Sequence, residues 1–349
     1  MDAASACGAS IMRNATNSEA GQDEFGKQRR NAVSEYLQLR SCWRHPWPHL
    51  FLLPARLAAL GYKYLRWKQA QGKTPPRWLC AAACMKNEAS YIEEWLRYHL
   101  LVGVEHFYLY NNNSEDGIEE VLRPWIECGL VTYTVWPGRH QQFAMYRHAL
   151  KKAAPETRWL ALIDIDEFIQ VLDGRKLSDF LREYGEASQL VIMWQHFGSN
   201  GRLKRDEGFV IERFTRREEG TCHVGKAITR PAAALDTLVH YCLVFGRSVD
   251  EDHLPLESFT PPLKNSASRI RVNHYAVKSQ EEYALKKSRG YATPGSFSDD
   301  YFQRLDRNEV EDESMLPYAE RIKMAISGSG GSAVADRDTG ASRAADLTR

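Results

Sequence analysis

The amino-acid sequence predicts an α/β protein in which helices flank a parallel sheet. The order of its segments supports this class. Between residues 77 and 171, short apolar runs alternate with amphipathic segments in a repeated strand–helix order, which is typical of parallel strands joined by helices. The 349 residues are 43% hydrophobic, so the chain can bury the core of one large or two modest domains.

The first half of the folded region is expected to contain four strands separated by three helices. The expected strands are residues 78–85, 105–111, 130–136 and 157–165, and the expected helices are residues 88–103, 117–129 and 142–154. In the first helix, Ile92, Trp95 and Leu96 recur near helical spacing. Pro124 and Gly129 are expected to end the second helix.

Beyond residue 173, the predicted strands are joined by longer connections that contain glycine and proline. Strand-like runs occur at residues 190–197, 208–214, 222–231, 235–244 and 269–277. Helices are expected to return at residues 279–290 and within residues 298–326.

The composition divides the chain into a folded domain, a helical extension and two tails. Both ends are polar, rich in small residues and free of any period, which predicts disorder. The parts are a disordered tail (1–35), a helical extension (36–76), a folded domain (77–326, with halves 77–173 and 174–326) and a second disordered tail (327–349).

Charge and cysteine content exclude several classes of protein. Lys plus Arg number 46 and Asp plus Glu number 45, so no overall field favours binding to nucleic acid. The seven cysteines are odd in number and lack the spacing of a zinc site or a disulfide framework, which favours a reducing compartment. We therefore expect a cytoplasmic protein.

The most apolar N-terminal stretch, LFLLPARLAALGYKYL, is predicted not to span a membrane. It is interrupted by Pro54 and Arg56 and is shorter than the roughly 18 residues that a bilayer span requires. Residues 1–30 show no basic start followed by an apolar core, so no secretory signal is expected. An amphipathic helix over residues 47–66 that lies on the inner face of a membrane stays open as a hypothesis.

Three carboxylates follow the fourth predicted strand in the sequence LIDIDEF: Asp164, Asp166 and Glu167. Because side chains alternate along a strand, Asp164 and Asp166 should point the same way while Ile165 points into the core. Neighbouring carboxylates raise each other's pKa unless a cation offsets them. Such oxygen ligands suit Mg²⁺ or Mn²⁺, which commonly bridge substrate phosphates. In the alternative interpretation, one Asp caps a following helix and the others are solvated, which is the commoner explanation for an isolated motif.

Two further polar clusters follow predicted strands and should lie at the same edge of the sheet. Lys86, Asn87 and Glu88 follow the first strand, and residues 111–116 follow the second. Ligands of open α/β sheets bind beyond the carboxyl ends of the strands. The alternatives are a helix N-cap with a first-turn acid for Asn87 and Glu88, and an Asx-turn for residues 111–116.

Candidate ligands for a metal and a diphosphate also occur in the second half. His274 ends the last strand-like run and as a neutral imidazole could complete a metal shell, with His240 as a competitor for that role. Basic candidates for diphosphate are Lys226, Arg230, Lys278 and Arg289. Trp194, His196 and Phe197 precede a GSNG loop and suit a sugar ring, although core packing is the commoner use of such residues.

Several of these motifs form an ordered set. They are CMKNEASYIEEWLRYHLLVGVEHFYLYNNNSEDG, the helix with Gln142 and Tyr146, RWLALIDIDEFI, MWQHFGSNG, KAITRP and VNHYAVKSQEEYALKKSRG. Together they resemble glycosyltransferase family 92 and related bacterial glycosyltransferases of the family 2 type, from about residue 78 to residue 290. The resemblance implies a GT-A type fold, in which a Rossmann-like mixed sheet forms a single continuous catalytic domain with a nucleotide-sugar half and an acceptor half.

The resemblance also implies a donor, a metal and site residues. The donor would be a UDP-hexose such as UDP-galactose, the cofactor Mn²⁺ or Mg²⁺, and the acceptor a glycan or polysaccharide. The residues assigned to the nucleotide sugar are Asn87, Glu88, Asn113, Asp116, Gln142, Arg147, Lys226 and Lys278, and those assigned to the metal are Asp164, Asp166 and His274.

Members of this family invert the anomeric centre, which calls for a carboxylate that deprotonates the acceptor hydroxyl. Glu212 and Glu207 are preferred because they follow the GSNG loop, on the expected acceptor side. Alternative bases are Glu167, Asp206, Glu281 and Glu282. Two other functions stay open: a non-catalytic nucleotide-sugar or carbohydrate-binding module, and a metal-dependent nucleotide-sugar hydrolase.

Overall fold

The computed structural model describes residues 46–220, 222, 224–256, 267–290 and 300–328, with side chains from residue 58 onward. The predicted tail at residues 1–35 lies outside this part of the chain, as do residues 329–349 of the second predicted tail. The first two residues of that second tail belong to a helix. The proposed membrane contact at residues 47–66 falls partly outside the described side chains.

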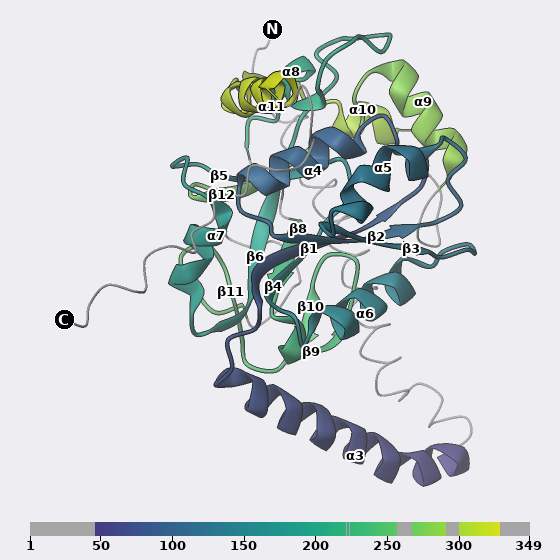
Figure 1. Cartoon of the computed structure of the whole chain (residues 1–349), viewed down its shortest axis with the longest axis vertical. Helices are drawn as coiled ribbons and strands as arrows, with labels where there is room; N and C mark the ends of the chain where they lie inside the picture. The colour runs from purple at the N-terminus through teal and green to yellow at the C-terminus, as the bar shows by residue number, and fades with distance from the viewer. Residues whose placement is uncertain (1–45, 221, 223, 257–266, 291–299, 329–349) are drawn as a thin grey trace, which may run out of the picture.

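The fold is organised around one mixed sheet (Figure 1). Its strand order is β3-β2-β1-β4-β8-β6-β12-β5, with β11 paired to β6. The strands are β1 (Arg77–Met85), β2 (His106–Asn111), β3 (Val131–Val135), β4 (Thr157–Leu162), β5 (Glu167–Val171), β6 (Ala187–His196), β8 (Gly225–Thr229), β11 (Arg247–Val249) and β12 (Ile270–His274). The predicted class, an α/β fold with a mixed sheet flanked by helices, is confirmed.

The directions of the strands bring distant parts of the sequence to one edge. Strands β1 to β4 are parallel, β8 runs antiparallel between β4 and β6, β12 is parallel to β6, and β5 is antiparallel to β12. The carboxyl ends of β1, β2, β4, β6 and β12 therefore meet the amino ends of β8 and β5. This edge is where ligands bind in open α/β sheets.

Alternating side chains of β1 build a core on each face of the sheet. Leu79 and Ala81 pack with helices α4 (Ile92–Leu101) and α5 (Ile118–Glu127), whereas Cys80 and Ala82 pack with α6 (Gln142–Ala153). In Figure 1 the first two helices lie above the sheet and α6 lies below it. The run of alanines in β1 leaves room for helices to approach both faces closely.

Most predicted elements of the first half are present, although β4 ends three residues earlier than expected and α5 continues past Pro124. This helix continues through Pro124 to Glu127 and is followed by Gly129 in a left-handed conformation (φ 78°). Trp125, the residue after the proline, is buried in the core. Its packing holds the last turn in place, so Pro124 does not end the helix as predicted.

The second half contains two differences from the predicted strands. Residues 208–214 hold a short helix, α8 (Val210–Arg213), because the Glu94 carboxylate on α4 accepts hydrogen bonds from the backbone N–H groups of Val210 and Ile211 (2.8 and 3.0 Å). The run 235–244 is a hairpin of two strands, β9 (Ala234–Thr237) and β10 (Cys242–Val244). Leu238 N–H donates to the Tyr241 carbonyl within its turn.

Among the described residues after β12 there are three helices: α9 (Gln280–Arg289), α10 (Tyr301–Leu305) and α11 (Leu316–Gly328). Helix α9 begins with a capping box, in which the Ser279 hydroxyl and the Glu282 carboxylate each accept a backbone N–H of the other residue. Short elements complete the described chain: α7 (Leu177–Phe180), β7 (Arg216–Arg217), β13 (Val310–Glu311) and the 3-10 turns Leu181–Tyr184 and Pro231–Ala233.

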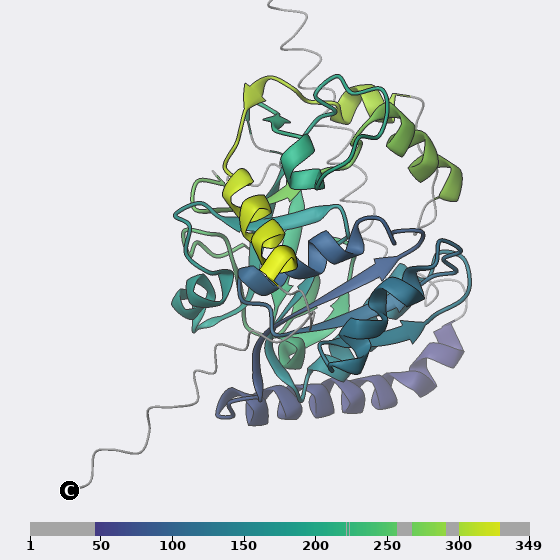
Figure 2. The ribbon, with the colours of Figure 1, turned by 45° about the horizontal axis from the view of Figure 1, so that its top comes forward.

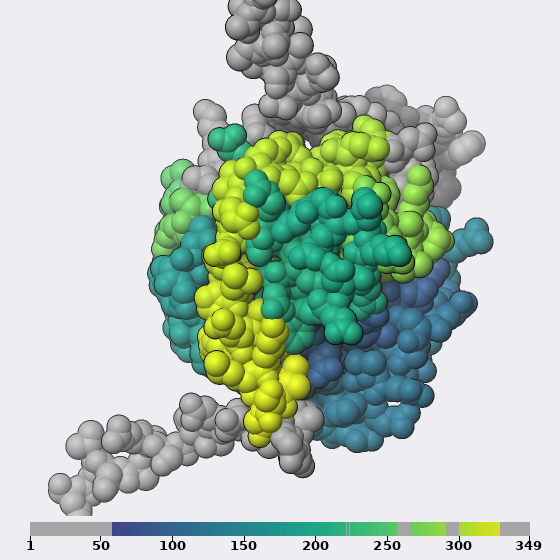
Figure 3. All heavy atoms as spheres, turned by 90° about the horizontal axis from the view of Figure 1, so that it is seen from above, coloured from purple at the N-terminus to yellow at the C-terminus, as the bar shows by residue number. Residues whose placement is uncertain are grey.

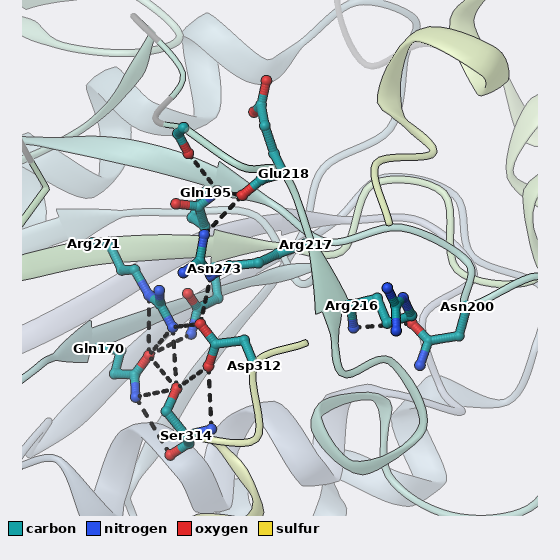
Figure 4. Close-up of polar contacts among 11 residues, drawn as sticks. Gln170, Gln195, Asn200, Arg216, Arg217, Glu218, Arg271, Asn273, Asp312 and Ser314 are labelled. Carbon is teal, nitrogen blue, oxygen red and sulfur yellow. Dashed lines mark hydrogen bonds and ion pairs between the residues drawn. The ribbon is translucent and has the colours of Figure 1, made fainter. Parts of the chain in front are cut away.

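A polar cluster joins residues 312–314, which precede α11, to strands β5 and β12 of the sheet (Figure 4). The Arg271 guanidinium donates to the Gln170 side-chain oxygen (2.9 Å), the Asp312 carboxylate (2.9 Å) and the Ser314 hydroxyl (3.1 Å). We call these four residues the Arg271 cluster. Within the cluster, the Arg271 charge is paired with the Asp312 carboxylate and the Gln170 amide is hydrogen-bonded. The cluster therefore stabilises the fold and needs no ligand.

Helix α3 (Pro46–Gln71) lies along the side of the molecule opposite α9 (Figure 2). Tyr64 and Trp67 contact the Phe245 ring, with ring centroids 5.6 and 5.4 Å away. Within the described part of the chain, no helix is long and apolar enough to cross a membrane.

Candidate active site

Asp164 and Asp166 lie in a turn between β4 and β5. The predicted strand ends at Leu162, so strand alternation does not set the directions of these side chains. Ile165 is nevertheless buried, as expected. The element that follows is strand β5 rather than a helix, so the interpretation of these residues as a helix cap is wrong.

Asp164 is oriented by three side chains. Its Oδ1 accepts hydrogen bonds from the Tyr146 hydroxyl (3.0 Å) and from Gln142 Nε2 (3.1 Å), and its Oδ2 accepts from Lys226 Nζ (2.8 Å). The Asp164 side chain is 32% exposed, whereas Lys226 is 1% exposed. Asp164 is therefore partly exposed to solvent, and both of its carboxylate oxygens accept hydrogen bonds from the protein.

Glu167 forms the interior side of this arrangement. It accepts the Asp164 backbone N–H (2.9 Å) and the Trp194 indole N–H (2.9 Å), and Lys226 Nζ lies 3.5 Å away. Burial alone would lower the pKa of Lys226, but the negative charges of Asp164 and Glu167 outweigh it and raise that pKa. Lys226 is thus a buried cation that offsets the negative charge of Asp164, Asp166 and Glu167, which we call the acidic turn.

Asp166 is held between a lysine and a histidine. Lys286 Nζ on α9 donates to Asp166 Oδ2 (2.6 Å), and His274 Nε2 at the end of β12 lies 3.8 Å from Oδ1. Burial alone would raise the pKa of Asp166, but the positive charges of Lys286 and Lys278 hold it well below its usual value, so the carboxylate is ionised.

His274 is a neutral imidazole whose Nε2 atom faces Asp166. Its burial lowers its pKa well below the usual range, and its Nδ1 atom is buried without a hydrogen-bond partner among the described residues. The ring packs on Trp194, with centroids 4.5 Å apart. A rigid, uncharged imidazole beside an ionised carboxylate is a donor pair that divalent ions accept.

The Asp166 and His274 side chains therefore fit a divalent ion with two protein ligands. No third His, Cys, Asp or Glu completes a metal-binding group within the described residues. Mg²⁺ and Mn²⁺ commonly take one or two carboxylates and fill the remaining positions with water and substrate phosphates. Asp164 would first have to leave Lys226 to become a third ligand.

Hydrogen bonds join the two loops, residues 86–89 and 111–116, that carry residues predicted to bind the nucleotide sugar, and we call them the nucleoside loops. Asn87 N–H donates to Ser114 Oγ (2.9 Å), Glu115 N–H donates to Asn87 Oδ1 (2.8 Å), and Ala89 N–H donates to Asp116 Oδ2 (2.6 Å). Asn87 and Asn113 both have left-handed backbone conformations (φ 54° and 58°), which asparagine tolerates better than most residues. Asn113 is exposed at the tip. The two loops thus form one wall.

Helix α9 joins this wall to the acidic turn. Arg289 forms an ion pair with Glu88 and donates to the carbonyls of Lys86 (2.7 Å) and Asn87 (3.0 Å). The Lys278 ammonium, which lies just before α9, is 4.5 Å from the centroid of the Tyr91 ring. One turn before Arg289, Lys286 reaches Asp166. The basic side chains at and around α9 therefore converge on the strand ends.

Arg147 and the two preferred bases are not brought to the acidic turn. Arg147 pairs with Asp236 (2.7 Å). Glu212 pairs with Lys323 on α11, and Figure 3 shows the segment around α8 side by side with α11 on one face of the molecule. Glu207 is exposed on the loop before α8. Within the described part of the chain, no hydrogen bond joins Glu207 or Glu212 to Asp164 or Asp166.

The alternative bases and His240 have structural partners. Glu282 is buried against Arg213 (2.8 Å), Asp206 pairs with Arg202, and Glu281 accepts the Arg205 backbone N–H (2.8 Å). His240 approaches the Gly225 carbonyl (3.1 Å), and burial lowers its pKa to about 3. His274 rather than His240 lies beside Asp166.

Lys286 was missed by the sequence interpretation. A signal for it existed, because Glu282, Lys286 and Arg289 are spaced to share one face of a helix that begins with a clear capping box. What the spacing does not show is which face of α9 meets the sheet.

Curated relatives match part of this chain and are much longer than it. A glycosyltransferase family 92 protein of Oryza sativa subsp. japonica is 30% identical over 219 residues, covering 62% of this chain and 36% of the relative. One from Ricinus communis is 28% identical over 257 residues, covering 69% and 42%. Galactan beta-1,4-galactosyltransferase GALS3 of Arabidopsis thaliana is 31% identical over 111 residues, covering 29% and 22%. The chain spans less than half the length of each.

Two solved structures show partial similarity to this chain. S. aureus TarS 1-349 in complex with UDP is 16% identical with a TM-score of 0.31, covering 45% of this chain and 47% of that one. Glucosyl-3-phosphoglycerate synthase from Mycobacterium tuberculosis, in complex with Mn²⁺, UDP and glucosyl-3-phosphoglycerate, is 16% identical with a TM-score of 0.25, covering 37% and 47%.

The sequence profile of glycosyltransferase family 92 matches residues 78–293. This range is more than half of the chain and contains the acidic turn, the nucleoside loops, His274 and α9. The chain therefore belongs to glycosyltransferase family 92.

Proposed function

We propose that this protein is a metal-dependent glycosyltransferase that transfers a hexose from a UDP-sugar to a hydroxyl of a glycan or other acceptor, with inversion. The observation that carries the proposal is the ionised Asp166 carboxylate beside the neutral His274 imidazole, 3.8 Å apart. Both lie at the sheet edge where the nucleoside loops also meet. Family membership and the mixed sheet support a catalytic domain of the GT-A type.

The site is built to accept a nucleotide diphosphate. Asp166 and His274 would hold Mn²⁺ or Mg²⁺, which when bound stabilises the negative charge that develops on the leaving diphosphate. The loops that carry Asn87 and Asp116 form the nucleoside side. Arg289 and Lys278 add positive charge between the two regions, which favours the anionic donor.

Glu207 stays our candidate for the general base. It lies in an exposed loop of the predicted acceptor half, whereas Glu212 is engaged by Lys323. A base on that side would take the acceptor proton as the hydroxyl oxygen attacks the anomeric carbon, while the bond to UDP breaks. A Glu207→Gln variant that keeps the wild-type kcat would remove this residue from the role.

UDP-galactose is the first donor to test, because similarity to galactan galactosyltransferases supports a hexose of this kind. UDP release should be measured with UDP-galactose, UDP-glucose, UDP-N-acetylglucosamine and GDP-mannose, with Mn²⁺ or with EDTA, and with and without oligosaccharide acceptors. We expect release from one UDP-hexose that needs Mn²⁺ and rises with an acceptor. Equal turnover in EDTA would contradict the metal-dependent mechanism, and release that no acceptor stimulates would favour a hydrolase.

A further inference from the structure

We propose that Lys286 is an exchangeable cation of the active site: it neutralises Asp166 in the free enzyme and transfers its contact to the donor diphosphate when the ion and nucleotide bind. This inference rests on the proposed function and extends it to a residue on α9. It makes Lys286 a coupling element between the metal and the UDP moiety.

Lys286 places a positive charge directly on the Asp166 carboxylate, which is a proposed metal ligand. Its Nζ lies 2.6 Å from Asp166 Oδ2 and 2.8 Å from the Ala276 carbonyl oxygen. The other carboxylate oxygen faces His274 Nε2. An ion bound by Oδ1 and His274 would share one carboxylate with an ammonium group, and the like charges would repel. Free metal should therefore bind weakly while Lys286 stays in place.

The main chain that carries Lys286 is fixed, but its side chain can move. Glu282, one turn earlier, is buried in a two-bond ion pair with Arg213 (2.8 and 3.0 Å). Arg289, one turn later, is tied to Glu88. Lys286 itself is 17% exposed, and a lysine has a flexible four-carbon stem. The ammonium can leave Asp166 without any movement of α9.

The diphosphate offers Lys286 a better partner than a neutralised Asp166. A metal at Asp166 would bring phosphate oxygens to the same corner, and ammonium groups form strong charge-assisted hydrogen bonds with phosphate. Once Lys286 has moved, its charge assists UDP instead of opposing the ion. Metal and nucleotide should therefore bind with positive coupling, because each favours the same position of Lys286.

Lys226 provides an internal contrast. It also contacts an aspartate of the turn, but it is 1% exposed and lies 3.5 Å from buried Glu167 as well. Moving Lys226 would separate a fully buried ammonium group from the Asp164 carboxylate 2.8 Å away, which is strongly unfavourable. Of these two lysines, the half-buried Lys286 is the one that can exchange partners.

The test is Lys286→Met, with Lys287→Met, the exposed lysine next to it on α9, as the matched control. Mn²⁺ binding is measured from the electron paramagnetic resonance signal of the free ion, and UDP binding by calorimetry. Without nucleotide, Lys286→Met should bind Mn²⁺ about 10-fold more tightly than wild type. At saturating Mn²⁺ it should bind UDP about 10-fold more weakly. The control should match wild type in both.

Two outcomes overturn the inference in different ways. If wild type binds Mn²⁺ and UDP together but Lys286→Met changes neither affinity, or weakens both, Lys286 is only a structural partner of Asp166. If wild type shows no Mn²⁺-dependent UDP binding, the proposed function itself fails, and this inference with it. Should Lys286→Met lose its folded near-ultraviolet circular dichroism signal, Lys286→Gln is measured against the same expectations.

Discussion

Two of the buried polar side chains on strand β12, Arg271 and His274, differ in how fully they are paired. On one face, Arg271 is matched by Gln170, Asp312 and Ser314 through bonds of 2.9 to 3.1 Å (Figure 4). On the other face, His274 Nε2 stands 3.8 Å from Asp166 Oδ1, which is too far for a hydrogen bond. The closed cluster stabilises the fold, whereas the open pair is available to a ligand.

Replacing Asp166 should have the largest effect of all on activity and little on stability. Asp166→Asn removes the ionised ligand but keeps the shape of the side chain. Turnover of the UDP-sugar should fall on the order of 10³-fold, or about 4 kcal/mol in the barrier, while the melting temperature changes by only a few degrees. Steady-state kinetics and differential scanning calorimetry measure the two quantities. Full turnover by this variant would contradict the assignment of Asp166 and His274 as the ligand-binding pair.

Replacing Arg271 should have the opposite profile. Arg271→Met removes one of the two guanidinium groups that pair with the buried Asp312 carboxylate, so the free energy of unfolding should fall by about 3 kcal/mol. Activity per folded molecule should be retained. Urea denaturation gives the first quantity and active-site titration the second. Arg182→Met, which removes an exposed arginine 3.6 Å from Asp179, is the control and should cost less than about 1 kcal/mol. Equal losses for both variants would refute the role of the cluster.

Glu282→Gln should fall between these two cases, because Glu282 belongs to a closed ion pair that supports the open site. It weakens the pairing with Arg213 and the cap at Ser279, which should lower the free energy of unfolding by about 2 kcal/mol. UDP binding should weaken several-fold, since Lys286 and Arg289 lie on the same helix. Calorimetric titration with UDP and Mn²⁺ checks this. If stability falls and UDP affinity does not, the Glu282 ion pair does not help α9 to place Lys286 and Arg289 for UDP binding.

The pH dependence of stability should report on the closed cluster and is the smallest effect expected. Burial alone would raise the pKa of Asp312, but Ser314, Arg271 and Arg217 outweigh it and lower that pKa from 3.8 to about 2. The stabilisation is therefore fully present above about pH 4 and is lost as the pH falls towards 2, with a magnitude of about 1 to 2 kcal/mol. The difference in unfolding free energy between wild type and Asp312→Asn should shrink over that range. A constant difference would contradict the assignment.

Local patterns predicted the first half of the fold well, and tertiary contacts explain the failures. The alternation of Leu79, Cys80 and Ala81 across β1 is visible in the sequence, as is the capping box of α9. Helix α8 is not, because its first N–H groups are satisfied by Glu94, a residue 116 positions earlier. The short extent of β4 was also hidden, since apolar residues recur past Leu162 at Ile163 and Ile165.

The candidate site was predicted only in part, because some of its contacts are also made between distant parts of the chain. Strand order places the loops after β1, β2, β4 and β12 at one edge, so Asn87, Asp116, Asp166 and His274 could be grouped from the sequence. The partners that set their charge could not. Which lysine reaches which aspartate depends on the antiparallel insertion of β8, which delivers Lys226, and on the docking of α9, which delivers Lys286.

The most direct test of the central claim is anomalous diffraction at the manganese edge from crystals grown with Mn²⁺ and UDP. We predict one anomalous peak about 2.2 Å from Asp166 Oδ1 and His274 Nε2, in contact with the UDP phosphates, with Lys286 Nζ withdrawn from Asp166. An ordered UDP whose phosphates contact no manganese, or a manganese bound away from both side chains, would contradict it.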